Sequence, residues 1–209
     1  MVSVSNGDCR ICGVKLGKTA MKNHVLKKHA DEANGEVCGL FKIEGAYNKN
    51  YWLLVDVAID KPLSVLDSFL RQIWLECCEH LSAFRVGNSE IEKNRKISSL
   101  PIGAIFTHEY DFGSTTELLI TIVAGVRRPK QRDAVRLLAR NTPPVRTCVK
   151  CGASATQICT ECMYDSENPF FCDACCEEHN EIHECALPAV NSPRMGVCGY
   201  DGEHDVWDI

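Results

Sequence analysis

The stretch Cys148–His183 reads CVKCGASATQICTECMYDSENPFFCDACCEEHNEIH and contains eight candidate metal ligands in four pairs. The pairs are Cys148-x2-Cys151, Cys159-x2-Cys162, Cys172-x2-Cys175 and His179-x3-His183. Zinc takes four thiolate or imidazole ligands in a tetrahedron, and two intervening residues let both sulfurs of a pair face one ion. Each pair therefore supplies half a site, and the stretch predicts two zinc ions.

The spacing between pairs allows either adjacent or alternating pairs to share an ion. We favour the alternating, cross-braced arrangement. One ion would take Cys148, Cys151, Cys172 and Cys175, and the other would take Cys159, Cys162, His179 and His183. Cys185 in place of His183 is an open alternative. The spacing resembles the B-box type of zinc finger, and more loosely the MYND and HIT fingers, which are small modules that bind proteins or nucleic acid.

Cysteine is concentrated in this part of the chain, since nine of the 14 cysteines follow Arg146. A disulfide framework would need an oxidising compartment. Met1–Asp8 lacks the pattern of a signal peptide, and no stretch approaches the roughly 20 apolar residues of a membrane span. We therefore expect reduced thiols on metal and a cytoplasmic protein without membrane contact.

Charge is also divided unevenly along the chain, whose formal net charge is −5. Residues 1–33 carry six Lys/Arg against three Asp/Glu, whereas residues 146–209 carry three against 12. Four thiolates around one divalent ion retain a charge of about −2, which makes the C-terminal part still more negative. We expect this part to contact a protein or another cationic partner rather than a phosphate backbone.

A third zinc site is predicted near the start, where Cys9-x2-Cys12 is followed after eleven residues by His24-x4-His29. This spacing resembles the Cys2His2 finger family over about 25 residues, although the aromatic residue usual in its core is absent. Lys18–His29 is predicted to be a helix that places both histidines on one face. The resemblance implies a structural ion bound by Cys9, Cys12, His24 and His29.

Two basic groups are candidate contacts for RNA or DNA. On the finger helix, lysines could contact phosphate and Asn23 could reach a base edge. These lysines are Lys18, Lys22, Lys27 and Lys28. The second group begins with Arg127 and Arg128 and continues through Lys130, Arg132, Arg136 and Arg140. A solvated face is the competing interpretation of this second group, and a single finger rarely gives tight specific DNA binding.

Residues 37–145, between the two zinc modules, are predicted to form an α+β domain. Tyr51–Ile59 (YWLLVDVAI) is too apolar for an edge and is predicted to be a buried strand. Pro62 and Ser64 begin a helix that runs through Glu76, with apolar core residues at helical spacing. Those core residues are Leu63, Leu66, Phe69, Leu70, Ile73 and Trp74.

Four more strands are predicted in this domain, with Asn88–Ser98 as a loop. They are Leu81–Val86, Ile105–Asp111, Glu117–Val123 and Val135–Ala139. The second and third form a hairpin around Phe112-Gly113-Ser114, in which Asp111 accepts backbone N–H bonds. The fold class is therefore α+β: a mainly antiparallel sheet with one covering helix, flanked by small zinc-binding modules at residues 1–33 and 146–209.

The central domain resembles the plasmid pRiA4b ORF-like family, also called the insertion-element passenger TnpR family, over about Gly39–Arg140. The resemblance is carried by the tryptophan-containing strand and its helix, by His80-Leu81-x2-Phe84 and by Glu109-Tyr110-Asp111-Phe112-Gly113. Ser114-Thr115-Thr116 replaces the acidic residue and tryptophan that usually follow. The family implies no established reaction.

No catalytic constellation is evident. His108-Glu109 lacks the second histidine of a metalloprotease helix, because Phe112 occupies its place. Cys77-Cys78-x-His80 could form a further metal site with Cys38, or could be buried thiols and a histidine bonded to backbone. We expect a non-enzymatic zinc-binding recognition or adaptor protein in a nucleoprotein complex, with three structural zinc ions and no small-molecule substrate.

Two alternatives to this function remain open. One is a protein-interaction module without nucleic acid. The other is a thiol enzyme or redox sensor that uses Cys77, Cys78 or Cys198 as its reactive group.

Overall fold

The computed structural model describes residues 5–184 and 186–205, and the chain divides into two compact units. The first unit comprises Met1–Leu70 and Leu81–Thr142. The second comprises Arg71–His80 and Pro143–Ile209. Each unit has its own sheet and its own groups of candidate metal ligands.

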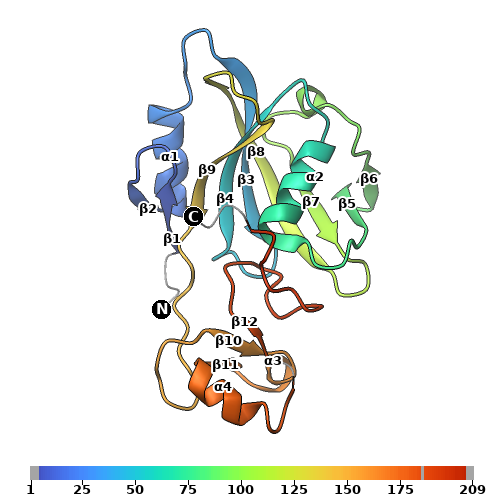
Figure 1. Ribbon diagram of the computed structural model, residues 1–209. Coiled ribbons are helices and arrows are strands. Elements are labelled where there is room, and N and C mark those ends of the chain that lie inside the picture. The colour runs from blue at the N-terminus through green and yellow to red at the C-terminus, as the bar shows by residue number, and fades with distance from the viewer. Residues whose placement is uncertain (1–4, 185, 206–209) are drawn as a thin grey trace. The chain divides into compact units, whose positions relative to one another are not determined.

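The first unit is built on a nine-stranded sheet (Figure 1). Its strands are β1 (Asn6–Cys9), β2 (Lys15–Gly17), β3 (Glu36–Gly45), β4 (Trp52–Ala58), β5 (Ser82–Val86), β6 (Ser89–Ile91), β7 (Ile105–Tyr110), β8 (Thr116–Arg128) and β9 (Val135–Asn141). They are ordered β2-β1-β9-β4-β3-β8-β7-β5-β6, and neighbouring strands are antiparallel. The predicted fold class, α+β with a mainly antiparallel sheet, is confirmed.

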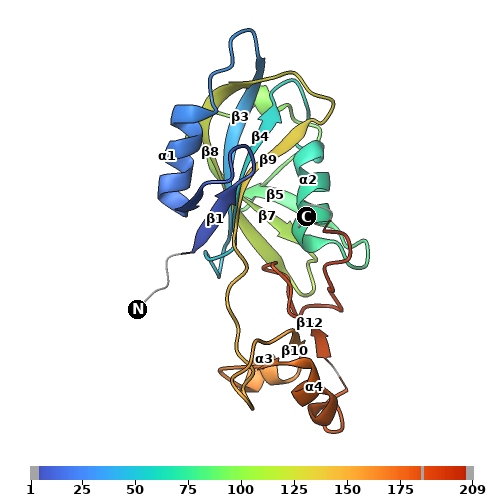
Figure 2. The ribbon, with the colours of Figure 1, turned by 60° about the vertical axis from the view of Figure 1, so that its left-hand side comes forward.

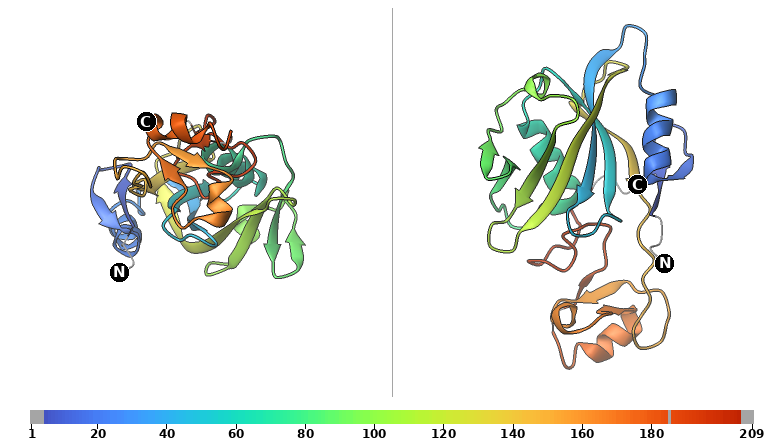
Figure 3. Two further views of the ribbon diagram at one scale, coloured as in Figure 1. Left: turned by 90° about the horizontal axis from the view of Figure 1, so that it is seen from below. Right: turned by 180° about the vertical axis from the view of Figure 1, so that it is seen from behind.

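The helices α1 (Lys18–Lys28) and α2 (Ser64–Leu70) lie on opposite sides of this sheet, as Figures 2 and 3 show. Met21 and Val25 of α1 pack in one core cluster with Trp52 and Leu54 of β4. Side chains alternate along a strand, so Leu53 and its alternate neighbours face the other way. Both faces of β4 are therefore covered, which explains why all seven of its residues are buried.

The predicted helix after Pro62 is present but changes its winding before its end. Helix α2 ends at Leu70, and Arg71–Leu75 form a π-helical turn, η1. The expected core residues are buried, which confirms the apolar pattern. They are Leu63, Leu66, Phe69, Leu70, Ile73 and Trp74.

The N-terminal finger is joined to the central sheet through β1, which pairs with β9. Gly7 lies opposite Asn141 in this pairing. A Cβ atom at Gly7 would come within 2.2 Å of Arg140 O and 2.6 Å of the Trp52 ring. Glycine at this position therefore permits the close approach of β1. Residues 30–35 form a polar turn that leads from α1 into β3.

Two features of the sheet differ from the sequence-based expectations, and a third agrees with them. Strand β3 was not predicted, although it pairs with both β4 and β8 along most of its length. The segment Asn88–Ser98, predicted as a loop, contains β6 and the start of the short 3-10 helix η2 (Ile97–Ser99). In the predicted hairpin, Asp111 Oδ1 accepts the N–H groups of Gly113 and Ser114 at 3.0 and 3.3 Å, as expected.

The second unit contains a three-stranded sheet in the order β11-β10-β12. Its elements are η1, β10 (Gln157–Cys159), α3 (Cys162–Asp165), β11 (Phe170–Phe171), α4 (Asp173–His179) and β12 (Ala186–Pro188). The tail after β12 returns to α3, since a Cβ atom at Gly196 would lie 3.1 Å from Met163 Sδ. Gly196 has φ +79°, a conformation that glycine adopts without steric cost.

Candidate metal centres

Four groups of Cys and His side chains could hold a metal ion, and in each group all ligand atoms lie within 4.8 Å of one another. The groups are Cys9/Cys12/His24/His29, Cys148/Cys151/Cys172/Cys175, Cys159/Cys162/His179/His183 and Cys77/Cys78/His80/Cys198. A zinc tetrahedron with bonds of about 2.0–2.3 Å has ligand–ligand edges of about 3.3–3.8 Å. The first three groups are those predicted from the sequence, and the fourth joins Cys198 to a trio for which the sequence left both a metal site and buried thiols open.

The N-terminal centre takes Cys9 from the end of β1 and His24 from α1. The turn that carries Cys9 and Cys12 is closed by two backbone hydrogen bonds. Cys9 N donates to Val14 O at 3.0 Å, and Gly13 N donates to Cys9 O at 2.8 Å. His24 Nε2 lies 3.2 Å from Cys12 Sγ and 3.1 Å from its counterpart on His29. The Cys9–Cys12 turn and the end of α1 therefore bring the four ligand atoms close together.

The position of His29 corrects one detail of the prediction. Residues five apart on a continuous helix point about 140° away from each other, so two such histidines do not share a face. Helix α1 ends at Lys28, and His29 follows it with φ −135°. This departure from helical geometry brings His29 back to His24. Burial, followed by the charge of His24, lowers the pKa of His29 and favours the neutral form that binds metal.

The first C-terminal centre consists of four cysteines on two separate segments. Cys148 and Cys151 flank a tight turn, in which Gly152 N donates to Cys148 O at 2.9 Å. Cys172 is the N-cap of α4 and Cys175 lies in its first turn. Cys151 Sγ is 3.6 Å from Cys172 Sγ, which joins the first cysteine pair to the third.

The second C-terminal centre alternates with the first along the chain. Cys159 ends β10, Cys162 begins α3 and His179 ends α4. Cys162 Sγ lies 3.4 Å from both His179 Nε2 and His183 Nδ1. The two sites therefore interleave as the cross-braced arrangement requires. Cys185, the alternative ligand considered from the sequence, lies outside the described residues.

The pKa values of Cys148 and Cys175, in the four-cysteine group, are shifted in opposite directions. Desolvation raises the pKa of Cys148, but backbone N–H groups, first that of Cys172, outweigh it and lower the pKa to about 6. Hydrogen bonding with Cys172 and then Cys151 raises the pKa of Cys175 to about 12. Four thiolates this close oppose one another, and a bound divalent cation would supply the charge that stabilises all four.

The trio Cys77, Cys78 and His80 has Cys198 as its fourth member, and not Cys38, which was one alternative left open by the sequence. Cys38 is fully buried on β3, within the core cluster that α1 covers. Burial raises its pKa to about 12, so Cys38 is an uncharged core thiol.

The candidate nucleic-acid contacts on α1 differ in exposure. Lys18 forms an ion pair with the buried carboxylate of Glu44, and its Nζ also donates to Lys49 O at 2.9 Å. Lys22 is half-buried. The exposed members of the group are Asn23, Lys27 and Lys28.

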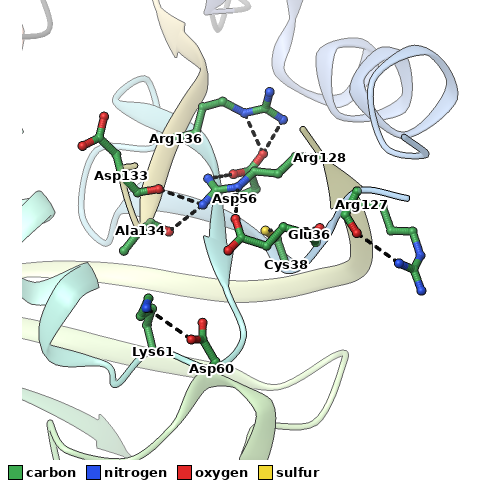
Figure 4. Close-up of polar contacts among 11 residues, drawn as sticks. Glu36, Cys38, Asp56, Asp60, Lys61, Arg127, Arg128, Asp133, Ala134 and Arg136 are labelled. Atoms are coloured by element: carbon green, nitrogen blue, oxygen red, sulfur yellow. Dashed lines mark hydrogen bonds and ion pairs between the residues drawn. The ribbon is translucent and has the colours of Figure 1, made fainter. Parts of the chain in front are cut away.

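Arg128 was a candidate contact, but its burial excludes a surface role. Its side chain is fully buried and pairs with Asp56 and Glu36 (Figure 4). Asp56 also accepts from Arg136 Nη2 at 2.6 Å. A buried guanidinium needs such partners, and here they occupy its donors. Arg127 remains exposed, with Nη1 donating to Gly35 O at 3.1 Å.

Sequence reasoning missed Asp56 as the partner of these arginines. The available signal was a single charged residue within the apolar strand YWLLVDVAI, because a buried carboxylate requires a cationic partner. It also missed Cys198, for which no spacing pattern exists. His80 Nε2 and Cys198 Sγ are 3.2 Å apart across 118 sequence positions.

Comparisons with known proteins identify neither a family nor an activity. No family model matches the chain, and no curated protein matches it either. A solved structure of a protein of unknown function from Methanosarcina mazei Go1 is similar at a TM-score of 0.44 and 15% identity. The match covers 57% of this chain and 76% of that chain. Among the described residues, no helix is both long and apolar enough to cross a membrane.

Proposed function

We propose that this protein is a non-enzymatic zinc-binding adaptor that acts in a nucleoprotein complex. The observation that carries the proposal is the closed ligand set of each predicted centre, with four protein ligands from cysteine and histidine alone. Thiolate and imidazole donors suit zinc rather than calcium or magnesium, which prefer oxygen. Four protein ligands leave no open position for substrate or water, so these three ions hold structure.

The exposed basic residues of α1 support an anionic partner at the finger. Lys27, Lys28 and Asn23 lie on the helix that carries His24 and that His29 directly follows. A pocket of about 310 Å³ in the first unit includes Lys18, Lys22 and Lys42 in its lining. Glu44 pairs with two of these lysines, which leaves the pocket only partly cationic. Phosphate groups of RNA or DNA are the partner chemistry that suits this face.

The second unit supports a protein partner instead. Residues 146–209 carry 12 Asp/Glu against three Lys/Arg, and thiolate-rich zinc centres add negative charge. An acidic surface repels a phosphate backbone and attracts a cationic protein surface. The first unit would thus bind an anionic partner and the second unit a cationic one. A protein that binds two partners in this way acts as an adaptor between them.

Two further candidate functions can be distinguished from the adaptor by experiment. A pure protein-interaction module would bind its partner only through the acidic second unit, and the exposed lysines of α1 would bind no nucleic acid. A thiol enzyme or redox sensor would need a cysteine that reacts rapidly at neutral pH in the zinc-loaded protein. Uniform protection of thiols from an alkylating reagent supports the adaptor, and one fast-reacting cysteine supports the sensor.

The nucleic-acid role is tested by fluorescence anisotropy with a labelled RNA hairpin and a labelled DNA duplex. Binding should weaken steeply as salt rises from about 50 to 200 mM, because phosphate contacts release counterions. The double variant Lys27→Gln, Lys28→Gln should reduce both affinity and salt slope. A matched control removes two lysines elsewhere, Lys61→Gln with Lys96→Gln, and should leave binding unchanged. Flat or absent binding of both nucleic acids would remove them from the proposal.

A further inference from the structure

A fourth group of ligand side chains lies entirely within the second unit. Its members are Cys77, Cys78, His80 and Cys198. All four ligand atoms lie within 4.8 Å of one another, and the 3.2 Å between His80 Nε2 and Cys198 Sγ is close to a tetrahedral edge of about 3.3 Å. Three sulfurs and one imidazole nitrogen form a donor set common in structural zinc sites.

The Cys77–His80 segment, which follows η1 and carries three of the four ligands, has an unusual backbone conformation. Glu79, between Cys78 and His80, has φ +57°, a left-handed conformation that side chains rarely adopt. Its N–H donates to Glu76 Oε1 at 2.7 Å, and Glu76 pairs with Arg71 at 2.5 Å. Arg71 Nη1 in turn donates to His80 O at 2.9 Å. These contacts stabilise the strained turn and fix the positions of its three ligands.

The fourth ligand, Cys198, comes from the tail, which is bonded to η1 through Trp74. Trp74 Nε1 donates to Asn191 O at 3.0 Å, and Ser192 Oγ donates to Trp74 O at 2.6 Å. Asn191 and Ser192 are buried, which strengthens both bonds. Cys198 itself has φ +51°. The tail is therefore positioned beside the Cys77–His80 segment by contacts independent of the cysteines.

The charge around the group also suits a metal-thiolate centre. Arg194 is fully buried, and its Nη2 lies 3.4 Å from Cys77 Sγ. Three thiolates and a neutral imidazole around a divalent ion leave a net charge of about −1. A guanidinium that donates to one of the sulfurs offsets this charge and orients the ligand.

We propose that Cys77, Cys78, His80 and Cys198 bind a fourth zinc ion, which clasps the Arg71–His80 segment to the C-terminal tail. The proposal rests on this ligand group and not on the nucleic-acid role. Cys78 and Cys198 are exposed, and no cysteine of this group is buried. Each of the other three groups contains a buried cysteine. The fourth ion is therefore the most accessible, and a chelator removes it first.

Native mass spectrometry of the full chain, purified under reducing conditions, tests the clasp by counting bound zinc. The wild-type protein should carry four ions and Cys198→Ser three. His80→Cys keeps four ligands and should retain all four ions. Cys176→Ala removes a thiol that belongs to none of the four groups and should also retain four. A limiting amount of chelator should reduce the wild-type count from four to three before any further loss.

Three zinc ions in both the wild-type protein and Cys198→Ser would overturn the proposal. So would a disulfide among Cys77, Cys78 and Cys198 in the reduced, zinc-loaded protein. Two more variants distinguish this failure from a failure of the predicted centres. Cys12→Ser and Cys159→Ser should each lose one ion from a different centre, whether or not the fourth ion binds.

Discussion

The Sγ atoms of Cys151 and Cys172 lie 3.6 Å apart, although the two residues are 21 positions apart in the sequence. This proximity joins the first cysteine pair to the third and leaves the second pair for the histidines. The second unit therefore contains two interleaved candidate centres, and metal bound at both would tie its segments together. Loss of one centre removes a constraint on segments that also carry ligands of the other.

Cys151→Ser tests this interdependence. The variant should lose the zinc of the four-cysteine centre, since serine is a poor zinc ligand at neutral pH. Structural zinc contributes on the order of 10–16 kcal/mol of apparent binding energy, so the second unit should lose most of its amide protection. Val149→Ser, on the exposed residue between the two ligands, is the control and should keep both properties. Equal protection in the two variants would show that this centre does not hold the fold.

Arg128→Ala should destabilise the first unit by about 3–5 kcal/mol, because it leaves the carboxylate of Asp56 buried with fewer partners. Urea unfolding monitored by tryptophan fluorescence measures the change. Arg127→Ala removes the neighbouring, exposed arginine and should change stability by less than about 0.5 kcal/mol. If both variants had the same small effect, the buried ion pair would not contribute to stability.

Gly7→Ala should loosen the finger from the sheet while its zinc is retained. The added methyl would meet Arg140 O and the Trp52 ring, an overlap that costs on the order of 1–3 kcal/mol. Amides of β1 and α1 should then exchange faster. Gly125→Ala, also in a strand, finds its nearest new neighbour at 3.9 Å and serves as the control. Unchanged exchange in β1 would argue against its docking on β9.

Asp67 gives the first unit a defined response to acid. Burial alone would raise the pKa of Asp67, but bonds from His108 and then Lys93 hold it well below its usual range. The stabilisation is therefore present above the unfolded pKa of about 3.9 and is lost as pH falls toward the folded value.

Asp67→Asn should cost about 1.5–3 kcal/mol at pH 7, and this difference from wild type should shrink below about pH 4. Urea unfolding of both proteins between pH 7 and pH 3 measures it. Protonation of zinc ligands affects both proteins, so it cancels in the difference. A difference that stays constant across this range would contradict the assigned role of Asp67.

Much of this architecture could be predicted from local spacing. Zinc ligands repeat at distances that backbone turns dictate, so the spacing in Cys148–His183 predicted four ligand pairs for two C-terminal centres. The spacing left the pairing open, and the structure groups the ligands in the alternating arrangement that we favoured. Strand β4 was recognisable because burial on both faces requires a nearly continuous apolar run, here interrupted only by Asp56. The Asp111 turn was recognisable because aspartate bonds the backbone N–H groups that follow it.

Contacts between distant segments could not be predicted in this way. Arg128 looks like part of a basic surface until its pairing with Asp56, 72 positions away, is known. Cys198 has no partner at zinc-finger spacing, so only the folded tail reveals its position beside His80. The π-helical turn at Arg71–Leu75 similarly depends on packing, because its sequence continues the apolar pattern of an ordinary helix.

Amide hydrogen exchange before and after chelation tests the central claim most directly, namely that zinc holds the second unit in its fold. The account predicts that chelation removes protection from Cys148–His183, that added zinc restores it, and that β3 and β4 retain theirs throughout. Protection in Cys148–His183 that survives complete removal of the metal would contradict the claim.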